Sequence, residues 1–122
     1  MWPTDRDTLI DLQHRLAAET PTLLDPEAVR VVAGCFVCFG RGGAGPGAAG
    51  DEGWGGAAAL EGGRIVSTAV VTGRAGAAYR PGLLAAREGP LLAAAVASLD
   101  PAPDLLLVNA TGRDHPRRAG LA

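Results

Sequence analysis

The Gly62-Gly63 pair is the feature that most constrains the fold of this chain, because it lies between two strand-like runs, residues 54–60 and 65–72. A Gly-Gly pair in this position is a strong signal for a tight hairpin turn, since the favoured turn has positive φ at both central residues. The run 29–39 upstream is also strand-like. The sequence therefore predicts a three-stranded antiparallel meander over residues 29–72.

Length and charge exclude several classes of protein. The chain has 122 residues and a mass of 12.3 kDa, which predicts one domain over residues 1–122 that exposes about 6,000 Å² when folded. A net charge of -2 excludes binding to nucleic acid through bulk positive charge. All basic residues are arginine, which excludes lysine-based covalent chemistry. No long apolar run or apolar leader is present, so we expect a cytoplasmic protein without a membrane span.

Residues 1–28 are predicted to form a packing helix followed by a loop. Thr4 is the predicted N-cap, and leucines repeat at helical spacing after it. The helix is expected to end before Pro21. Residues 40–53 are rich in glycine and carry no apolar anchor, which predicts a long connection. A phosphate-cradling loop is the alternative there, although the glycine spacing differs from that of a P-loop and lysine is absent.

Cys35 and Cys38 form a C-x-x-C pair within the strand-like run 29–39. In a strand their Cα atoms would be about 10 Å apart on opposite faces, which is too far for a disulfide. No second cysteine pair completes a zinc site. We interpret both as buried structural thiols, with chemistry at either of them as the alternative.

Residues 82–99 have the pattern of a helix, with a kink or a restart expected at Gly89-Pro90. Glu88 falls within the apolar arc of this helix, which comprises Leu84, Leu91, Leu92, Val96 and Leu99. A carboxylate on a buried face is costly unless it is paired, binds a metal or opens on a cavity, so Glu88 is the strongest site candidate. The alternatives are that Glu88 turns to solvent, or that Arg87 or Arg74 pairs with it.

Residues 104–108 form a short apolar run, which predicts a strand buried on both faces and parallel to a neighbour. Asn109 follows at the carboxyl end, where open sheets place ligand-binding residues; a plain turn residue is the alternative. In the tail, residues 109–122, His115 is a candidate acid or base. Three arginines that could contact phosphates lie near it: Arg113, Arg117 and Arg118. A solvated tail is the alternative interpretation.

The predicted order of elements is helix, three-stranded meander, helix and strand. Because the last strand follows a crossover helix, we expect it to join the sheet in parallel. This order indicates an α+β or a mixed α/β fold with a central sheet, and we take α/β as the predicted fold class.

Two long segments resemble the endonuclease V family. Residues 79–90 read YRPGLLAAREGP and residues 103–120 read PDLLLVNATGRDHPRRAG, which match a Tyr-x-Pro-Gly-x-x-x-x-Arg-Glu-x-Pro segment and a later strand followed by His-Pro-Arg-Arg. Residues 32–39 match the family's first strand. The resemblance implies a ribonuclease H-like fold, of which this chain covers the N-terminal half. It also implies a relation to Mg²⁺-dependent cleavage of nucleic acid near inosine.

The chain departs from the family at the metal ligands. The resemblance implies three acids that hold the metals, and only the helix acid is present, as Glu88. Phe36 stands at the position of the first-strand acid and Asn109 at that of the later-strand acid. Hard cations depend on oxygen ligands and negative charge, so we expect a degenerate active site and no metal cofactor. Tyr79 matches the family's aromatic wedge beside a flipped base, with Arg80 as a variable neighbour.

Three interpretations of function stay open. In the first, the chain has lost nuclease activity and binds a partner or a ligand in the former catalytic cleft. In the second, the cleft has become a metal-free enzyme for a small molecule, with Glu88 as acid or base and with Asn109 and His115 assisting. In the third, cleavage of inosine-containing nucleic acid persists. The residues expected to line a ligand site are Cys35, Phe36, Tyr79, Arg80, Arg117 and Arg118.

A homodimer is the predicted assembly. Without the second half of the family fold, we expect an exposed edge on the strand 104–108 and an exposed apolar face of the sheet. Such surfaces favour pairing with another chain. A small-molecule ligand and weak binding of nucleic acid are further expectations, and no membrane partner is expected.

Overall fold

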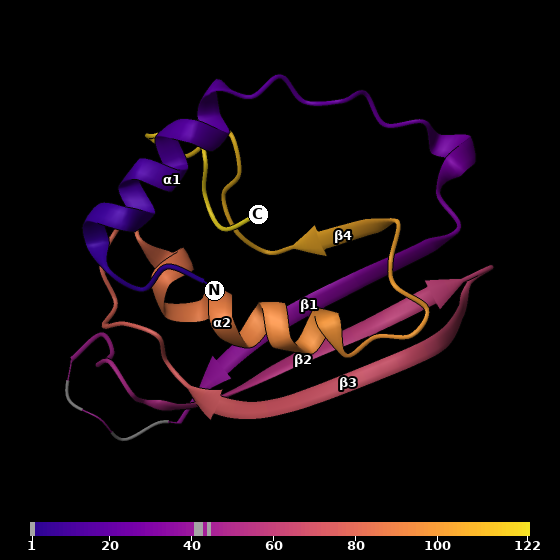
Figure 1. The fold of residues 1–122 in the computed structure, drawn as a ribbon. Coiled ribbons are helices and arrows are strands. Elements are labelled where there is room, and N and C mark those ends of the chain that lie inside the picture. The colour runs from indigo at the N-terminus through magenta and orange to yellow at the C-terminus, as the bar shows by residue number, and fades with distance from the viewer. Residues whose placement is uncertain (1, 41–42, 44) are drawn as a thin grey trace.

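In the computed structural model, the chain forms a four-stranded mixed sheet with a long helix across one face (Figure 1). The structure describes residues 2–40, 43 and 45–122. The strands are β1 (Val31–Phe39), β2 (Glu52–Glu61), β3 (Arg64–Arg74) and β4 (Leu105–Val108), and the helices are α1 (Arg6–Ala18), the short 3-10 helix η1 (Pro26–Ala28) and α2 (Leu84–Ala97). The sheet order is β3-β2-β1-β4, with β4 parallel to β1 and the other pairs antiparallel. The predicted meander, crossover helix and parallel strand are confirmed.

The hairpin turn between β2 and β3 has the predicted chemistry. Gly62 and Gly63 have φ values of 57° and 77°, so the turn uses the left-handed region at both central positions. The neighbouring residues Glu61 and Arg64 are already paired as the ends of the two strands. The two strands therefore extend beyond the predicted ranges 54–60 and 65–72 at this end, and only Gly62 and Gly63 remain as the turn.

The helix α2 packs against β1, β2 and β3 through small side chains. The core cluster between them consists of Val31, Ala33, Ala57, Ala59, Ala95 and Leu99. The expected restart at Pro90 does not occur, because α2 runs through Pro90 as one helix. Close packing explains the glycine at position 89, since a Cβ there would meet the ring of Trp2. The Nε1 atom of Trp2 donates to the carbonyl of Ala85 at 2.7 Å. The result is a thin core between one helix and the sheet.

The strand β4 lies at an edge of the sheet and is not buried on both faces as predicted. Leu106 and Leu107 are 36% and 61% exposed. Within the described residues, α2 is the only helix that contacts the sheet, so side chains of β4 on the opposite face have no cover. The carboxylate of Asp104 accepts the N–H groups of Arg30 and Val31, both at 2.9 Å, which ties the start of β4 to β1.

The N-terminal helix and the C-terminal segment pack on each other. The side chain of Asp5, not Thr4, caps α1, by accepting the N–H of Thr8 at 2.9 Å. Residues 109–122 fold back beside α1 and are not a solvated tail (Figure 1). Gln13 of α1 donates to the carbonyl of Ala119 at 2.9 Å, and Leu121 packs against the apolar cluster that contains Leu9 of α1.

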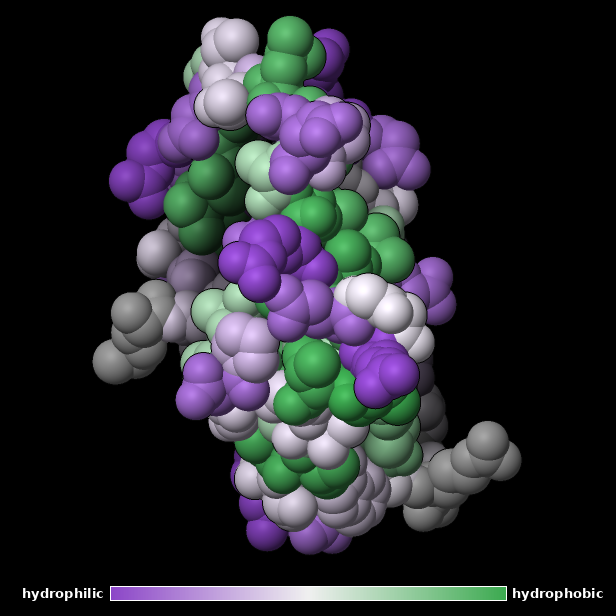
Figure 2. Space-filling view, turned by 90° about the vertical axis from the view of Figure 1, so that its right-hand side faces the viewer, coloured by the Kyte–Doolittle hydropathy of each residue, from purple (hydrophilic) through white to green (hydrophobic). Residues whose placement is uncertain are grey.

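The accessible surface is 7806 Å², larger than the surface of about 6,000 Å² predicted for a folded monomer of this mass. Figure 2 shows apolar residues that reach the surface in several patches between polar ones, on the side of the molecule that carries the β2–β3 turn. Within the part of the chain that the structure describes, no helix has the length and apolar character needed to cross a membrane.

Candidate functional site

A small cleft opens where β4 ends beside β1. The pairing of these strands stops at Cys35 and Val108, so β1 continues past the end of its parallel neighbour. The cleft has a volume of about 130 Å³ and is lined by Cys35, Phe36, Val37, Glu88, Leu92, Val108, Asn109 and Leu121. The structure therefore brings four predicted site residues together: Cys35, Phe36, Glu88 and Asn109.

Glu88 is the titratable group of this cleft. It lies in the first half of α2, half-buried, and burial raises the pKa of its carboxyl above the ordinary value, while the nearby Arg87 acts in the opposite direction. Arg87 does not pair with Glu88, because its guanidinium binds Asp51 instead. The alternative that Arg87 pairs with Glu88 is therefore wrong.

The raised pKa of Glu88 predicts a pH-dependent effect of Glu88→Gln. Because the folded-state pKa lies above the unfolded one, the free-energy cost of ionising Glu88 in the fold is absent below the unfolded pKa, grows as the pH rises from the unfolded to the folded pKa, and is constant above the folded pKa. We expect Glu88→Gln to raise the Tm by about 2–4 °C at pH 7 and to leave it unchanged at pH 3. Thermal unfolding followed by circular dichroism at both pH values tests this, and an equal shift at both would contradict it.

Phe36 and Asn109 are both exposed. The ring of Phe36 lies over Gly56, where a Cβ would come within 2.6 Å of it. A Cβ at the neighbouring Gly55 would instead meet the backbone of Leu91 in α2, so Gly55 faces α2 and Gly56 faces the other way. The ring of Phe36 therefore lies on the face of the sheet opposite α2, and Phe36 lies at the border of the cleft. Asn109 follows directly on β4.

The two cysteines lie on opposite faces of β1, as predicted, and both are free thiols. Cys35 packs beside the core cluster, and burial raises the pKa of its thiol. Its environment is that of an unreactive structural thiol. Cys38 is exposed, so the prediction that both thiols are buried is wrong for Cys38.

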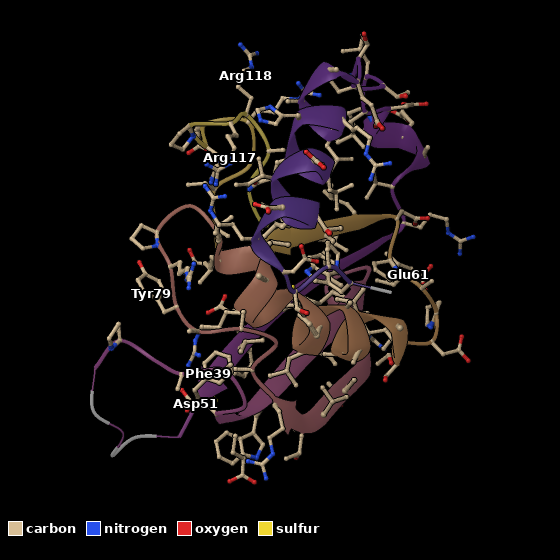
Figure 3. The ribbon with its side chains drawn as sticks, turned by 60° about the vertical axis from the view of Figure 1, so that its left-hand side comes forward. Phe39, Asp51, Glu61, Tyr79, Arg117 and Arg118 are labelled. Atoms are coloured by element: carbon tan, nitrogen blue, oxygen red, sulfur yellow. The ribbon has the colours of Figure 1, made fainter. Side chains whose placement is uncertain are left out.

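A second cavity, of about 570 Å³, adjoins the first through Glu88, which lines both. Tyr79 and Phe39 contribute its aromatic side chains, and part of the glycine-rich connection forms another wall. Figure 3 shows Tyr79, Phe39 and Asp51 on the same side of the molecule. Tyr79 is 41% exposed, so its ring can meet a ligand. The connection was expected to lack an anchor; its residues 41, 42 and 44 lie outside the described part.

Arg87 anchors the described end of that connection. Its guanidinium, in a residue only 5% exposed, donates to the carbonyls of Ala48 (2.9 Å) and Ala77 (3.2 Å) and to Asp51 (2.9 Å), and it lies 4.0 Å from the centroid of the Phe39 ring. The N–H of Ala48 and then Arg87 hold the pKa of Asp51 below its ordinary value. We call these contacts the Arg87 clasp.

His115 and Arg117 form a polar network behind Tyr79. The Nε2 atom of buried His115 lies 2.9 Å from the carbonyl of Gly82, and its Nδ1 accepts the N–H of Arg117. Arg117 also donates to Gln13 at 2.6 Å and to the carbonyl of Gly82 at 2.7 Å. These bonds engage both ring nitrogens of His115 and two of the guanidinium nitrogens of Arg117, so few donors of Arg117 are available to a ligand.

The network forms one wall of a third cavity, of about 300 Å³, between Tyr79 and the C-terminal segment. Arg80 lines this cavity and is exposed. Arg118 is exposed and points away from the body of the molecule in Figure 3. Arg113 donates to the carbonyls of Ala17 and Glu19 at the end of α1. Of the predicted ligand residues, Tyr79 and Arg80 thus line the 300 Å³ cavity, whereas Arg117 and Arg118 do not.

Among residues 2–40, 43 and 45–122, no three histidine, cysteine, aspartate or glutamate side chains are grouped as they would be to hold a metal ion. In the 130 Å³ cleft Glu88 is the one carboxylate among the lining residues. Asn109 could supply one amide oxygen and Phe36 none.

Comparison with known proteins agrees with this geometry. Residues 12–122 match the family model described as Endonuclease V. This chain belongs to the endonuclease V family. Relatives named Endonuclease V are 35% identical over 96% of this chain in Natronomonas pharaonis and 33% identical over 99% of it in Gloeobacter violaceus. The predicted family is therefore confirmed.

Solved endonuclease V structures share the fold. The enzyme of Streptomyces avermitilis superposes with a TM-score of 0.77 at 27% identity over 98% of this chain, and the catalytic domain of human endonuclease V with 0.69 at 26% over 97%. The chain spans about half the length of these relatives, between 47% and 53%. The predicted ribonuclease H-like fold, represented by half of the family structure, is confirmed.

Sequence reasoning missed the Arg87 clasp and the role of Gln13. The sequence predicts Arg87 only as a partner for Glu88 and places Asp51 in the glycine-rich connection 40–53. The structure explains one glycine of the connection, since at Gly47 a Cβ would come within 2.5 Å of the Arg87 guanidinium. The spacing of glycines cannot reveal which distant side chain approaches them.

Proposed function

We propose that this chain has lost the metal-dependent nuclease activity of its family and acts by binding nucleic acid at the former catalytic cleft. The observation that carries the proposal is the lining of the 130 Å³ cleft, where Glu88 stands with Phe36 and Asn109. One carboxylate with a neutral amide and a phenyl ring supplies too little charge for the divalent cations that cleave phosphodiesters.

Tyr79 supports a nucleobase as the ligand. It borders both the 570 Å³ and the 300 Å³ cavities, and these volumes fall within the range of about 300–1,000 Å³ of ligand sites. Aromatic side chains stack on any base, and Arg80 beside Tyr79 can meet a phosphate. A related fold, the endonuclease V of Ciona intestinalis, has been solved with DNA that contains inosine. A strand of nucleic acid is therefore the ligand class that we assign to the cavities beside Tyr79.

The small-molecule enzyme is the second candidate, and the pKa of Glu88, raised by burial, favours it. The volume of the cleft opposes it. At about 130 Å³ the cleft that Glu88 shares with Asn109 is smaller than typical small-molecule sites. Glu88 also lines the 570 Å³ cavity, but Asn109, its expected assistant, does not line that cavity and is exposed. Nucleic-acid binding requires no closed pocket around Glu88, so we prefer it.

Replacing Tyr79 tests the binding role. We expect the chain to bind a fluorescent single-stranded oligonucleotide that contains one inosine, and Tyr79→Ala to weaken binding about tenfold, because a base–aromatic stack contributes about 1–3 kcal/mol. Tyr79→Phe retains the ring and is the matched control, expected to bind like the unmodified chain. Fluorescence anisotropy measures the affinities. No binding at 100 µM protein, or equal binding by Tyr79→Ala, would contradict the proposed role.

Metal dependence tests the loss of cleavage. We expect no heat of Mg²⁺ or Mn²⁺ binding in calorimetry, and no cut in the same oligonucleotide at millimolar metal. Cleavage that depends on metal and disappears in Glu88→Ala would show that the nuclease activity persists. The two tests are independent. Anisotropy measures binding of the oligonucleotide, whereas calorimetry and the cleavage assay measure metal binding and nuclease activity.

A further inference from the structure

One whole face of the sheet has no partner in the described chain. Strand alternation directs Val31, Ala33, Ala57 and Ala59 towards α2, and their neighbours in each strand the other way. The exposed large side chains on this opposite face come from all four strands, and we call it the open face: Phe36, Leu60, Ile65, Val70 and Leu107. Val70 is 77% exposed and Phe36 62%.

The open face carries no charge over its centre. The side chains that alternate onto it from β1 are Val32, Phe36 and Cys38, and those from β2 are Trp54, Ala58 and Leu60. Charged residues occur only at its ends, where Glu52 pairs in register with Arg74. An uncharged apolar patch with a polar rim is the composition of a protein interface, and monomers rarely expose one of this extent.

The total surface supports the same conclusion. The chain exposes 7806 Å², about 1,800 Å² more than the surface of about 6,000 Å² expected by scaling for a folded monomer of its mass. Extended segments such as residues 19–25 contribute to this excess, and so does the open face. A standard interface buries about 800 Å² on each partner, so the excess is large enough for one such interface.

The small size of the core is an energetic reason to expect a partner on the open face. The cluster between α2 and the sheet is built largely from alanine, and each alanine buries little apolar area. Burial of the larger side chains of the open face would add the apolar contact that this core lacks.

We propose that the open face binds a second copy of this chain, to form a two-fold symmetric dimer with the two sheets face to face. An uncharged face is complementary to itself, and the charged residues at its end offer both signs, Glu52 with Arg74, so two copies meet without like-charge repulsion there. The net charge of -2 per chain adds little repulsion. Stacked sheets lie about 10 Å apart, which buries the five large side chains in both copies.

The test is the mass of the 122-residue chain in solution, with substitutions on the open face. We expect light scattering after gel filtration to give twice the chain mass of 12.3 kDa. Leu107→Asp and Val70→Asp are expected to weaken self-association about 30-fold each, as loss of an interface hot spot does. Leu23→Asp is the matched control, because Leu23 is 93% exposed in the loop after α1, and it should leave the mass unchanged. Far-UV circular dichroism checks that each variant is folded.

The two cysteines give a second measurement that needs no substitution on the face. Cys38 lies on the open face and is exposed in the single chain, while Cys35 lies on the α2 side. We expect alkylation of Cys38 to slow at least tenfold between dilute and 100 µM protein, and the rate at Cys35 to stay constant. A monomeric mass together with an alkylation rate of Cys38 that does not depend on protein concentration would overturn the proposal. The open face would then bind another protein or a further segment of a longer chain. A dimer unaffected by Leu107→Asp and Val70→Asp, or open-ended aggregation, would overturn it too.

Discussion

Replacing Arg87 with methionine is expected to lower the free energy of unfolding by about 3 kcal/mol. Arg87 is 5% exposed, and its guanidinium donates to two backbone carbonyls and one carboxylate while it stacks on Phe39. Methionine retains the apolar stem but none of the donors, so the carbonyls of Ala48 and Ala77 lose their partners. Urea unfolding followed by circular dichroism measures the change.

Asp51→Asn separates the charge from the remainder of the Arg87 clasp. An amide oxygen still accepts from the N–H of Ala48 and from Arg87, so we expect a smaller loss of stability than in Arg87→Met. Equal stability of Arg87→Met and the unmodified chain would contradict the interpretation of the clasp as an anchor. A loss in Asp51→Asn as large as that in Arg87→Met would assign the effect to the ion pair alone.

The Arg87 clasp also connects stability to the ligand site. The N–H of Tyr79 donates to the carbonyl of Gly47 at 3.2 Å, so the connection that Arg87 holds in turn fixes the backbone of Tyr79. We therefore expect Arg87→Met to accelerate hydrogen exchange at the amides of residues 47–51 and 75–79 before the strands open. Arg87 is thus a positioning residue for the proposed stacking group.

Local patterns predicted most of the fold. The hairpin followed from Gly62-Gly63, because the turn type requires positive φ at both residues and few other pairs supply it. The parallel position of β4 followed from the crossover helix, since a strand that returns after a helix joins its sheet in this way. In both cases, the information lies within a few neighbouring residues or in the order of elements.

The errors concern what distant residues do. The apolar run 104–108 reads as a strand buried on both faces, yet its exposure depends on whether anything covers the opposite face of the sheet. Cys38 alternates onto that same face and is exposed for the same reason. Residues 109–122 read as a polar tail, and their packing against α1 depends on Gln13, about a hundred residues away in the sequence. Periodicity within a segment carries no information about such partners.

The candidate site was found by two separate signals. The helical arc identified Glu88 from its pattern alone, because a carboxylate among apolar positions is costly. Asn109 was indicated by its position at the carboxyl end of the strand 104–108, where open sheets place ligand-binding residues. Phe36 gave no signal of its own, and only the resemblance to endonuclease V identified it. The structure then brings all three to one cleft, while it engages His115 and Arg117 in bonds that hold α1, Gly82 and the C-terminal segment together.

Replacing Phe36 and Asn109 with aspartate in one variant is expected to create a divalent cation site. Position 109 would then place a second carboxylate in the 130 Å³ cleft beside Glu88, and position 36 a third at its border, and affinity for hard cations rises with the charge and number of oxygen ligands. We expect Mn²⁺ to bind at least about 100-fold more tightly than to the unmodified chain. Isothermal calorimetry with Mn²⁺ measures it. Both positions are exposed, so the substitutions should not disturb the core.

The matched control keeps the size and polarity of these side chains but removes the charge. Phe36→Asn, with Asn109 unchanged, places amides at both positions and disturbs the open face as much as aspartate does at position 36. If charge decides metal binding, the aspartate variant gains affinity and the asparagine variant does not. Glu88→Gln added to the aspartate variant should then reduce the gain, since it removes one of the three carboxylates. Equal Mn²⁺ affinity in the aspartate and asparagine variants would mean that the geometry of the cleft, and not the missing charge, prevents metal binding in this chain.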